Sequence, residues 1–155
     1  MPDADRFMTK AIALARDNVR KGGRPFGAVL VIDGEVVATG VNGVMETRDP
    51  TAHAELVAVR EAAIKRGAAT LKGASVYASG HPCPMCLAAM RLAGITDIFY
   101  AYSNEDGAPY GLTSAPLYAD LRKPFADQQM TFSYLPVRPE GEVDIYDFWR
   151  EMQQG

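Results

Sequence analysis

Two short motifs that carry metal-ligand side chains constrain this chain most. Its only cysteines, Cys83 and Cys86, lie three residues apart in the run 82–86, and His53 and Glu55 lie two apart earlier in the chain. One imidazole and two thiolates give three ligands for Zn²⁺, which favours four ligands in a tetrahedral array. In catalytic zinc sites a water takes the remaining position. The motifs therefore predict a fold that brings both segments together around an open zinc site.

Length and composition indicate one soluble globular domain. The 155 residues are enough for one sizeable core, and 48% apolar with 23% charged residues is ordinary for a globular protein. The net charge of -3 gives no sign of a basic surface for nucleic acid. Both cysteines belong to the expected metal site, and we find no signal-like or membrane-spanning apolar run. We therefore expect a cytoplasmic protein without disulfides or a membrane partner.

The apolar pattern predicts helices and strands that alternate along the chain. A first helix is expected from Asp3 or Asp5, as its N-cap, to Gly22-Gly23. The further elements expected are strands over 27–32 and 35–41 joined by an Asp33-Gly34 turn, a helix over 51–66, a strand over 74–78, a helix over 84–93, a strand over 95–101, a loop over 104–113, a short helix over 114–121, a strand over 131–137 and a helix over 143–152. This order predicts a three-layer α/β domain that spans residues 1–155.

The expected metal ligands lie where local structure supports them. Cys83 and Cys86 fall at the start of a predicted helix, so their sulfurs share one helical face. The partial positive charge of a helix N-terminus lowers a thiol pKa and favours the thiolate that binds metal. Pro84 suits the first turn, where its missing N–H removes no helical hydrogen bond. The spacing therefore has a physical reason at each position.

Glu55 is the expected proton carrier of this site. It is too close to His53 in the sequence to serve readily as a second ligand from the same turn. Zinc lowers the pKa of a bound water from about 15.7 towards about 7. A carboxylate beside it can take the water's proton and then pass protons to a ring nitrogen and to a departing amine. The pattern predicts hydrolytic deamination at an amidine-type carbon of an aromatic ring.

Other interpretations of the same residues remain open. The Cys-x-x-Cys motif could be redox-active, and His53 could be a hydrogen-bonded core residue. A closed structural zinc site would require a fourth protein ligand, for which His81 is the one other histidine. The joint occurrence of both motifs favours the open site.

The segments 49–55 and 82–90 resemble the cytidine-deaminase-like superfamily, and more narrowly the bacterial guanine deaminase and nucleoside deaminase branch. The segments 23–29 and 41–42 extend the resemblance upstream. It implies a central five-stranded mixed sheet flanked by helices, and one Zn²⁺ per subunit. It also implies a homodimer, in which C-terminal segments from about residue 115 can be exchanged between subunits.

The resemblance also implies roles for residues around the metal. The family's equivalent of Asn42 hydrogen-bonds the base, that of Phe26 lines the pocket, and that of His53 binds zinc while its ring faces the base. We count Ala54, between His53 and Glu55, among the candidate substrate-binding residues. Without the resemblance, Asn42 is as readily explained as a turn residue. Phe26 alone is more often a core aromatic than a pocket residue.

Three positions depart from the family pattern, and all concern specificity. His81 occupies a position where the superfamily often has Glu, Leu92 replaces an aromatic residue, and Ser114 falls where bacterial guanine deaminases carry an acidic residue. Leaving polar substrate groups unpaired costs about 1–3 kcal/mol each. Either Glu105 or Asp106 supplies a carboxylate from the loop, or the substrate differs. His81, Ser114 and Asp106 are therefore candidate substrate contacts, although Asp106 also fits a solvated turn.

Aromatic side chains near the C-terminus are further candidates. Tyr110, Phe148 and Trp149 could cap a pocket, the last two from a partner subunit, or could simply pack on a helix face.

The function expected first is deamination of a free nucleobase, with a guanine-like purine ahead of pyrimidines. Cytosine or another aminated heterocycle, such as a pterin, a triazine or a nucleoside, is the nearest alternative. A tRNA adenosine substrate is disfavoured by the acidic charge balance, and nucleic acid is not an expected partner. A zinc-binding module without catalysis would not require Glu55.

Overall fold

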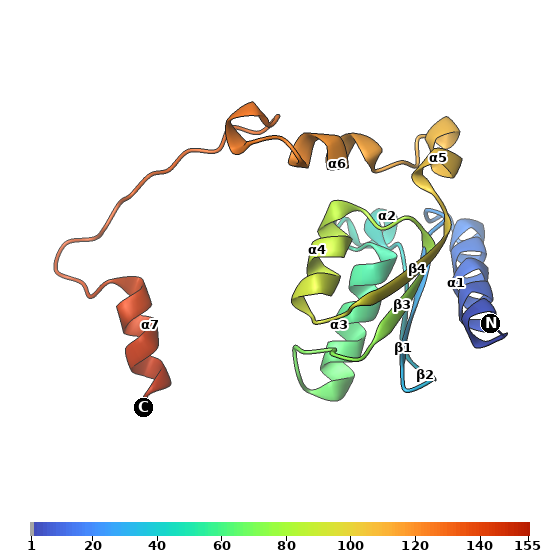
Figure 1. Ribbon diagram of the computed structural model, residues 1–155, viewed down its shortest axis with the longest axis horizontal. Coiled ribbons are helices and arrows are strands. Elements are labelled where there is room, and N and C mark those ends of the chain that lie inside the picture. The colour runs from blue at the N-terminus through green and yellow to red at the C-terminus, as the bar shows by residue number, and fades with distance from the viewer. Residues whose placement is uncertain (1) are drawn as a thin grey trace. The chain divides into compact units, whose positions relative to one another are not determined.

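A computed structural model of the protein describes residues 2–155, which form two units. The first unit ends at Arg122 and holds the β-sheet, and the second comprises Lys123–Gly155. The first contains α1 (Pro2–Arg20), β1 (Gly27–Ile32), β2 (Glu35–Val41), α2 (Val44–Thr47), α3 (Ala54–Arg66), β3 (Ser75–Gly80), α4 (Pro84–Leu92), β4 (Asp97–Tyr102), α5 (Asn104–Gly107), the 3₁₀ turn η1 (Ala108–Tyr110) and α6 (Ala115–Leu121). The second contains η2 (Phe125–Asp127) and α7 (Ile145–Gln153) (Figure 1).

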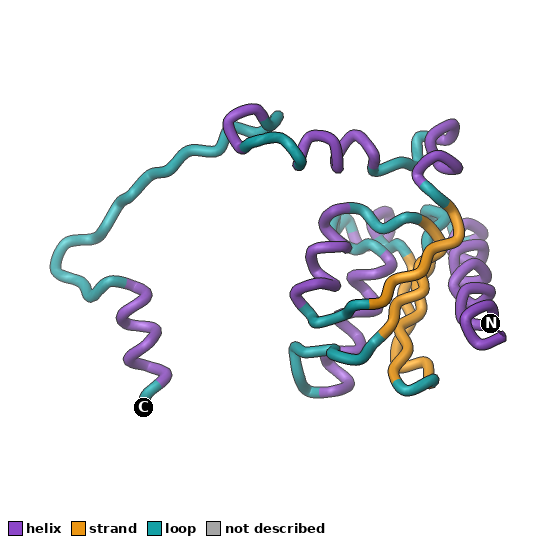
Figure 2. The backbone as a smooth tube through the Cα atoms, viewed as in Figure 1, coloured by secondary structure: helices purple, strands orange, loops and turns teal. Residues whose placement is uncertain are grey.

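The sheet of the first unit has four strands in the order β2-β1-β3-β4. Strand β1 runs antiparallel to both of its neighbours, whereas β3 and β4 are parallel. Helix α1 covers one face, and α3 with α4 covers the other (Figure 2). The predicted three-layer α/β arrangement of a cytidine-deaminase-like fold is therefore confirmed, with a mixed sheet.

Each face of the sheet has its own apolar core. Val29 on β1 packs with Phe7 of α1 on one face, and Leu30 packs with Met90 of α4 on the other. Successive side chains of a strand point to opposite faces, so a central strand buried on both sides reads as a continuous apolar run. This explains the sequence of β1, whose residues 27–31 are all buried.

Several boundaries differ from the prediction. Both strands of the first hairpin have the expected bounds, but α3 begins at Ala54, because His53 takes an extended conformation as its N-cap. Asp3 and Asp5 do not cap α1; they lie in its first turn, where negative charge is favourable. The loop expected over 104–113 contains two short helical segments.

The strand predicted over 131–137 is not formed, and the sheet has four strands instead of the implied five. A strand requires a neighbour for its backbone hydrogen bonds, and residues 131–137 form no ladder in the structure described. Their aromatic side chains are exposed, as Tyr134 illustrates with an exposed fraction of 84%. The strand-like sequence of this segment does not by itself provide a pairing partner.

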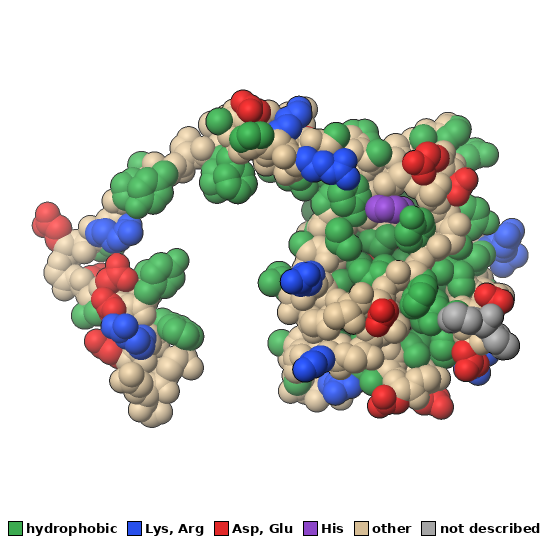
Figure 3. All heavy atoms as spheres, in the orientation of Figure 1, with side chains coloured by type: hydrophobic (Ala, Val, Ile, Leu, Met, Phe, Trp, Pro, Cys, Tyr) green, Lys and Arg blue, Asp and Glu red, His purple; other side chains and the backbone are tan. Residues whose placement is uncertain are grey.

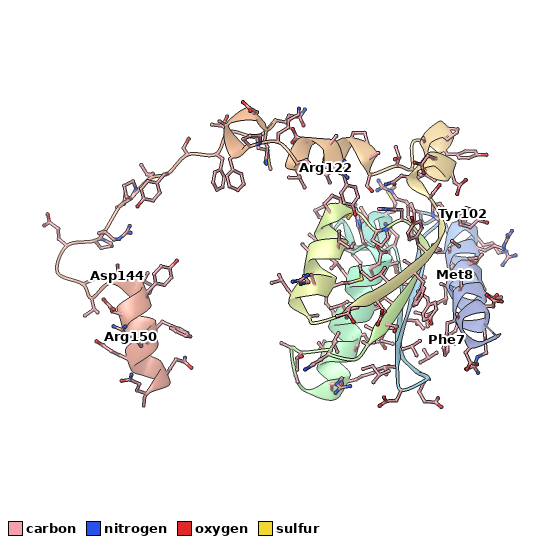
Figure 4. All side chains as sticks on the ribbon, viewed as in Figure 1. Phe7, Met8, Tyr102, Arg122, Asp144 and Arg150 are labelled. Carbon is pink, nitrogen blue, oxygen red and sulfur yellow. The ribbon has the colours of Figure 1, made fainter. Side chains whose placement is uncertain are left out.

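The second unit has an amphipathic helix and no buried residues of its own. Asp144 caps α7 by accepting a hydrogen bond from the Tyr146 backbone N–H, and Arg150 pairs with Asp147. Asp144 and Arg150 are labelled in Figure 4. The exposed apolar side chains of this helix are Ile145, Tyr146, Phe148, Trp149 and Met152. Space-filling views show hydrophobic side chains on the surfaces of both units (Figure 3). Within residues 2–155 no helix combines the length and apolarity that crossing a membrane requires.

Gly40 sets the distance between β2 and the helix that begins at the metal site. A Cβ atom at this position would overlap the Ala54 carbonyl oxygen and lie 2.8 Å from the Ala58 backbone nitrogen. Both obstacles are backbone atoms of α3, so they cannot rotate away. Only glycine allows the strand and this helix to pack so closely.

We expect Gly40→Ala to lower the free energy of unfolding by about 1–3 kcal/mol, because the added methyl group overpacks the contact between β2 and α3. Urea unfolding measures the effect. Gly43→Ala is a matched control, since a Cβ there would meet its nearest atoms at 3.7 and 3.8 Å and its φ of -108° suits alanine. Equal stability of the two variants would contradict this account of the contact.

Candidate metal centre and substrate pocket

Two helix N-termini bring the three expected metal ligands together. His53 is the N-cap of α3, Cys83 is the N-cap of α4, and Cys86 lies in the first turn of α4. The His53 Nδ1 atom lies 3.5 Å from the Cys83 sulfur and 3.6 Å from the Cys86 sulfur, and the two sulfurs are 3.6 Å apart. In the described part of the chain, this is the cluster of His, Cys and acidic side chains that can hold a metal ion.

The spacing of these ligand atoms fits zinc. Zn–S distances of about 2.3 Å and Zn–N distances of about 2.0–2.1 Å in a tetrahedron place neighbouring ligand atoms about 3.5–3.8 Å apart. The three measured separations agree with that range. His53, Cys83 and Cys86 are thus the zinc-binding triad, as the sequence predicts.

His81 is held away from this triad. Its Nδ1 atom lies 3.0 Å from the Pro82 carbonyl oxygen, and its ring packs edge-on against Tyr100 and Tyr118. The Tyr118 hydroxyl donates to the same carbonyl. The closed structural site that would use His81 as a fourth ligand is therefore not formed among residues 2–155.

The cysteines are electrostatically unequal. A hydrogen bond from the Cys86 thiol lowers the pKa of Cys83 to about 4, with a further contribution from His53. The pKa of Cys86 is raised, because its thiol proton is shared with Cys83 and its side chain is buried. The hydrogen bond to Cys83 raises the pKa of His53, whereas burial and, to a smaller extent, the positive charge of Arg24 oppose this rise. Of the two cysteines, Cys83 therefore has the lower pKa.

Glu55 lies in the first turn of α3, beside the triad and almost fully buried. Burial raises the pKa of its carboxyl group above the ordinary value. A raised pKa brings a carboxyl group closer to the pH range in which a general acid–base group both accepts and releases a proton. Glu55 also lines the same pocket as His53 and Cys83.

This pocket opens at the C-terminal ends of the parallel strands β3 and β4, the usual place for a ligand site in an α/β sheet. Most of the residues expected from the sequence come together there. Its walls include Phe26, Asn42, His53, Glu55, His81 and Ser114.

Asn42 is buried and fixed at three points. Its side-chain oxygen accepts a hydrogen bond from the Val44 backbone N–H at 3.1 Å, and its backbone N–H donates to Phe26. Its carbonyl oxygen accepts from the Asn18 side chain at 2.9 Å. Because the side-chain oxygen is engaged, the amide NH₂ group is the part of Asn42 that can donate to a ligand.

Ser114 lines the pocket with a neutral side chain. Its backbone N–H and hydroxyl both donate to the Asn104 side-chain oxygen, at 3.0 and 3.2 Å. Although Ser114 is the N-cap of α6, its side chain makes no capping bond.

Three other candidates lie elsewhere. Asp106 accepts hydrogen bonds from the backbone N–H and hydroxyl of Ser103 and is not among the pocket-lining residues. Ala54 is fully buried in the core between the sheet and α3. Tyr110 is exposed and outside the pocket, and Phe148 and Trp149 belong to the second unit.

The sequence reasoning missed other pocket residues, chiefly Arg24, Tyr102 and Thr113. Tyr102 is the last residue of β4, as Figure 4 shows. Because β4 runs parallel to β3, the strand that leads to Cys83, the ends of both strands lie at the same edge of the sheet, and this could have indicated Tyr102. Arg24 precedes Phe26 by two residues in the same turn. The expected position of Phe26 in the pocket was therefore the sequence signal that could have indicated Arg24.

Comparisons with known proteins agree with this geometry. Residues 1–102 match the family model described as the cytidine and deoxycytidylate deaminase zinc-binding region. This chain belongs to that deaminase family. It is a zinc-dependent deaminase that is similar to guanine deaminase.

Guanine deaminase from Bacillus subtilis (strain 168) is 40% identical over 147 residues, covering 94% of this chain and 93% of that protein. An X-ray structure of guanine deaminase from Bacillus subtilis aligns with a TM-score of 0.86 and 36% identity, over 95% of this chain and 93% of the other. A tRNA-specific adenosine deaminase from Aquifex aeolicus is 31% identical over 95% of this chain and 94% of its own length. The structure of NE0047 in complex with 2,6-diaminopurine aligns with a TM-score of 0.67 and 26% identity, over 72% of this chain and 62% of that one.

We expect Cys83 to react with iodoacetamide at pH 6 once a chelator has removed zinc, because a thiol with a pKa of about 4 is already ionised there. Cys86 should stay unmodified, since its pKa is raised. Mass spectrometry of peptides locates the label, and zinc-loaded protein is the control that should be protected. Equal labelling of both cysteines, rising only near pH 8–9, would contradict the assignment.

Proposed function

We propose that the chain hydrolyses the exocyclic amine of a free, guanine-like purine and releases ammonia. The observation that carries this proposal is the buried carboxyl group of Glu55, which shares one pocket with a three-ligand zinc triad. A structural zinc site does not require a buried carboxyl group that is not a ligand. The position of Glu55 therefore also argues against a zinc-binding module without catalysis.

The side chains around the triad have distinct roles in this proposal. When bound, zinc supplies Lewis-acid activation of a water. Glu55 accepts a proton from that water and delivers protons to the ring nitrogen and to the leaving amine. Asn42 donates its amide NH₂ to an acceptor on the substrate, and the Phe26 ring packs on the heterocycle. His53 orients the base from the metal side.

The guanine-like substrate is supported by similarity to guanine deaminase along nearly the whole chain and by a related structure that holds 2,6-diaminopurine. Cytosine, pterins, triazines and nucleosides remain the alternatives to test. A tRNA adenosine substrate has one observation in its favour, the 31% identity to a tRNA-specific adenosine deaminase. The net charge of -3 disfavours it, because neutralising phosphates requires basic side chains.

We expect Glu55→Gln to lower the turnover number with guanine by about 10²–10⁴-fold, because the amide can neither accept nor deliver the proton. Zinc content should stay near one per chain, since Glu55 is not a member of the triad. Ammonia release and elemental analysis provide the two measurements, with cytosine, adenine, a pterin, a triazine and an RNA stem-loop as further substrates. Retained turnover in this variant would disprove the assigned role.

We propose further that two copies exchange their C-terminal units to complete one deaminase domain each. Residues 123–155 have no buried residues, yet Phe148 and Trp149 expose large apolar side chains. In the first unit, β4 lies at a sheet edge with Tyr100 and Tyr102 exposed. The segment 131–137 of a second copy would supply the fifth strand that the family resemblance implies.

We expect the purified chain to have the mass of a dimer by light scattering, because the free C-terminal unit cannot bury its apolar side chains alone. On dilution, loss of dimer should coincide with faster hydrogen exchange of the α7 amides. A monomer at every concentration with protected α7 amides would show that the segment packs on its own chain and would rule out the exchange.

A further inference from the structure

The charges of the pocket wall are unusual for a site that must bind a donor-rich base. Glu55 is its one carboxylate and Arg24 its one permanent cation, counting the described residues. Ser114 and Thr113 are neutral. Once Glu55 is assigned to proton transfer, the described part of this wall has no second carboxylate to accept from a ligand, whereas Arg24 and Asn42 offer N–H donors.

The backbone of Arg24 lies in a turn that hydrogen bonds hold at the pocket. Its carbonyl oxygen accepts hydrogen bonds from the Asn18 side chain at 2.8 Å and from the Phe26 backbone N–H at 2.9 Å. A Cβ at Gly23 would lie 2.5 Å from the Asn18 amide nitrogen and 2.8 Å from its Cγ, so glycine is required for this close packing. The backbone of Arg24 is therefore fixed, although its side chain is exposed.

The same Asn18 amide also donates to the Asn42 carbonyl oxygen at 2.9 Å. One buried side chain thus ties together the backbones of two pocket residues, Arg24 and Asn42. Both carry donor groups that can face a ligand. Among residues 2–155, no hydrogen bond or ion pair engages the Arg24 guanidinium, which leaves its N–H groups free for a substrate.

The position of the reacting amine limits which substrate edges can meet these donors. The amine-bearing carbon must lie beside the zinc triad and Glu55, so the far edge of the ring faces away from them. In guanine that far edge carries the C6 oxygen and N7, which are two adjacent acceptors. A guanidinium donates two parallel N–H groups, and its paired contact with these two atoms is the commonest specific contact of arginine with guanine.

We propose that Arg24 is a specificity-determining residue, which selects 6-oxopurines by donating two hydrogen bonds to the C6 oxygen and N7. This inference rests on the proposed purine deamination. Selection among purines then depends on the Arg24 guanidinium, which donates to the acceptor atoms of the base. Ser114 has no carboxylate that could accept from the N–H groups of the base. Purines that lack the C6 oxygen lose one of the paired contacts.

The test compares guanine with 2-aminopurine, which has the same reacting amine but no C6 oxygen, using zinc-loaded full-length protein. We expect Arg24→Ala to lower kcat/KM for guanine by about 10–100-fold and for 2-aminopurine by less than about threefold. Arg24→Lys should give an intermediate loss for guanine, because it keeps the charge but not the planar fork. Arg66→Ala removes an exposed charge outside the pocket and is the matched control.

A second readout separates binding from chemistry. In the Glu55→Gln background, Arg24→Ala should weaken guanine binding by a similar factor, measured by calorimetry, and leave 2-aminopurine binding, measured by its fluorescence, nearly unchanged. Equal losses for both purines, or no loss, would overturn the role of Arg24 while leaving the proposed deamination intact. A loss confined to an RNA stem-loop would overturn it in favour of a phosphate contact. Zinc-loaded wild-type protein that turns over neither purine would contradict the proposed function itself.

Discussion

The structure depends on balancing charge where α3 and α4 begin. Both helices direct their N-termini at the same point, and each N-terminus carries a partial positive charge of roughly half a unit. A divalent cation at that point would be repelled unless negative ligands lay between. The two sulfurs, Cys83 and Cys86, can supply two negative charges there, and the pKa of Cys83 is already lowered to about 4 without the metal. The Cys-x-x-Cys spacing therefore places two metal ligands, and the negative charge that a divalent cation needs, at the start of α4.

The same arrangement explains why Glu55 can act in catalysis. It lies in the first turn of α3, one residue beyond Ala54, whose burial in the core fixes the helix against β2. Its carboxyl group is buried, so its pKa is raised and its proton is retained more readily than in water. Rigid packing at Gly40 keeps this helix close to the sheet. Core packing and proton transfer are thus properties of one short segment.

Much of the first unit could be predicted from the sequence, because the signals are local. The apolar run of 27–32 and the Asp33-Gly34 turn define the first hairpin, and Pro84 marks the start of α4. The metal triad was predicted as well, since ligand type and spacing carry the information. The hairpin, the start of α4 and the metal triad are each indicated by a few residues in short sequence motifs.

Other features depend on partners that a single sequence does not reveal. The segment 131–137 has a strand-like pattern, but a strand forms only beside another strand. The sequence makes Asp106 a candidate for the pocket, yet it closes a capping box with Ser103, a local signal that the sequence does contain. Arg24 reaches the pocket through tertiary contacts of Asn18, which no periodic pattern indicates.

The coordination shell of zinc tests the central claim most directly. X-ray absorption spectroscopy of the zinc-loaded protein should show two sulfurs at about 2.3 Å and two nitrogen or oxygen neighbours at about 2.0–2.1 Å, only one of them an imidazole. That shell is what an open site with three protein ligands and a water gives. Two sulfurs with two imidazoles would indicate a closed structural site that recruits His81, and would contradict the account.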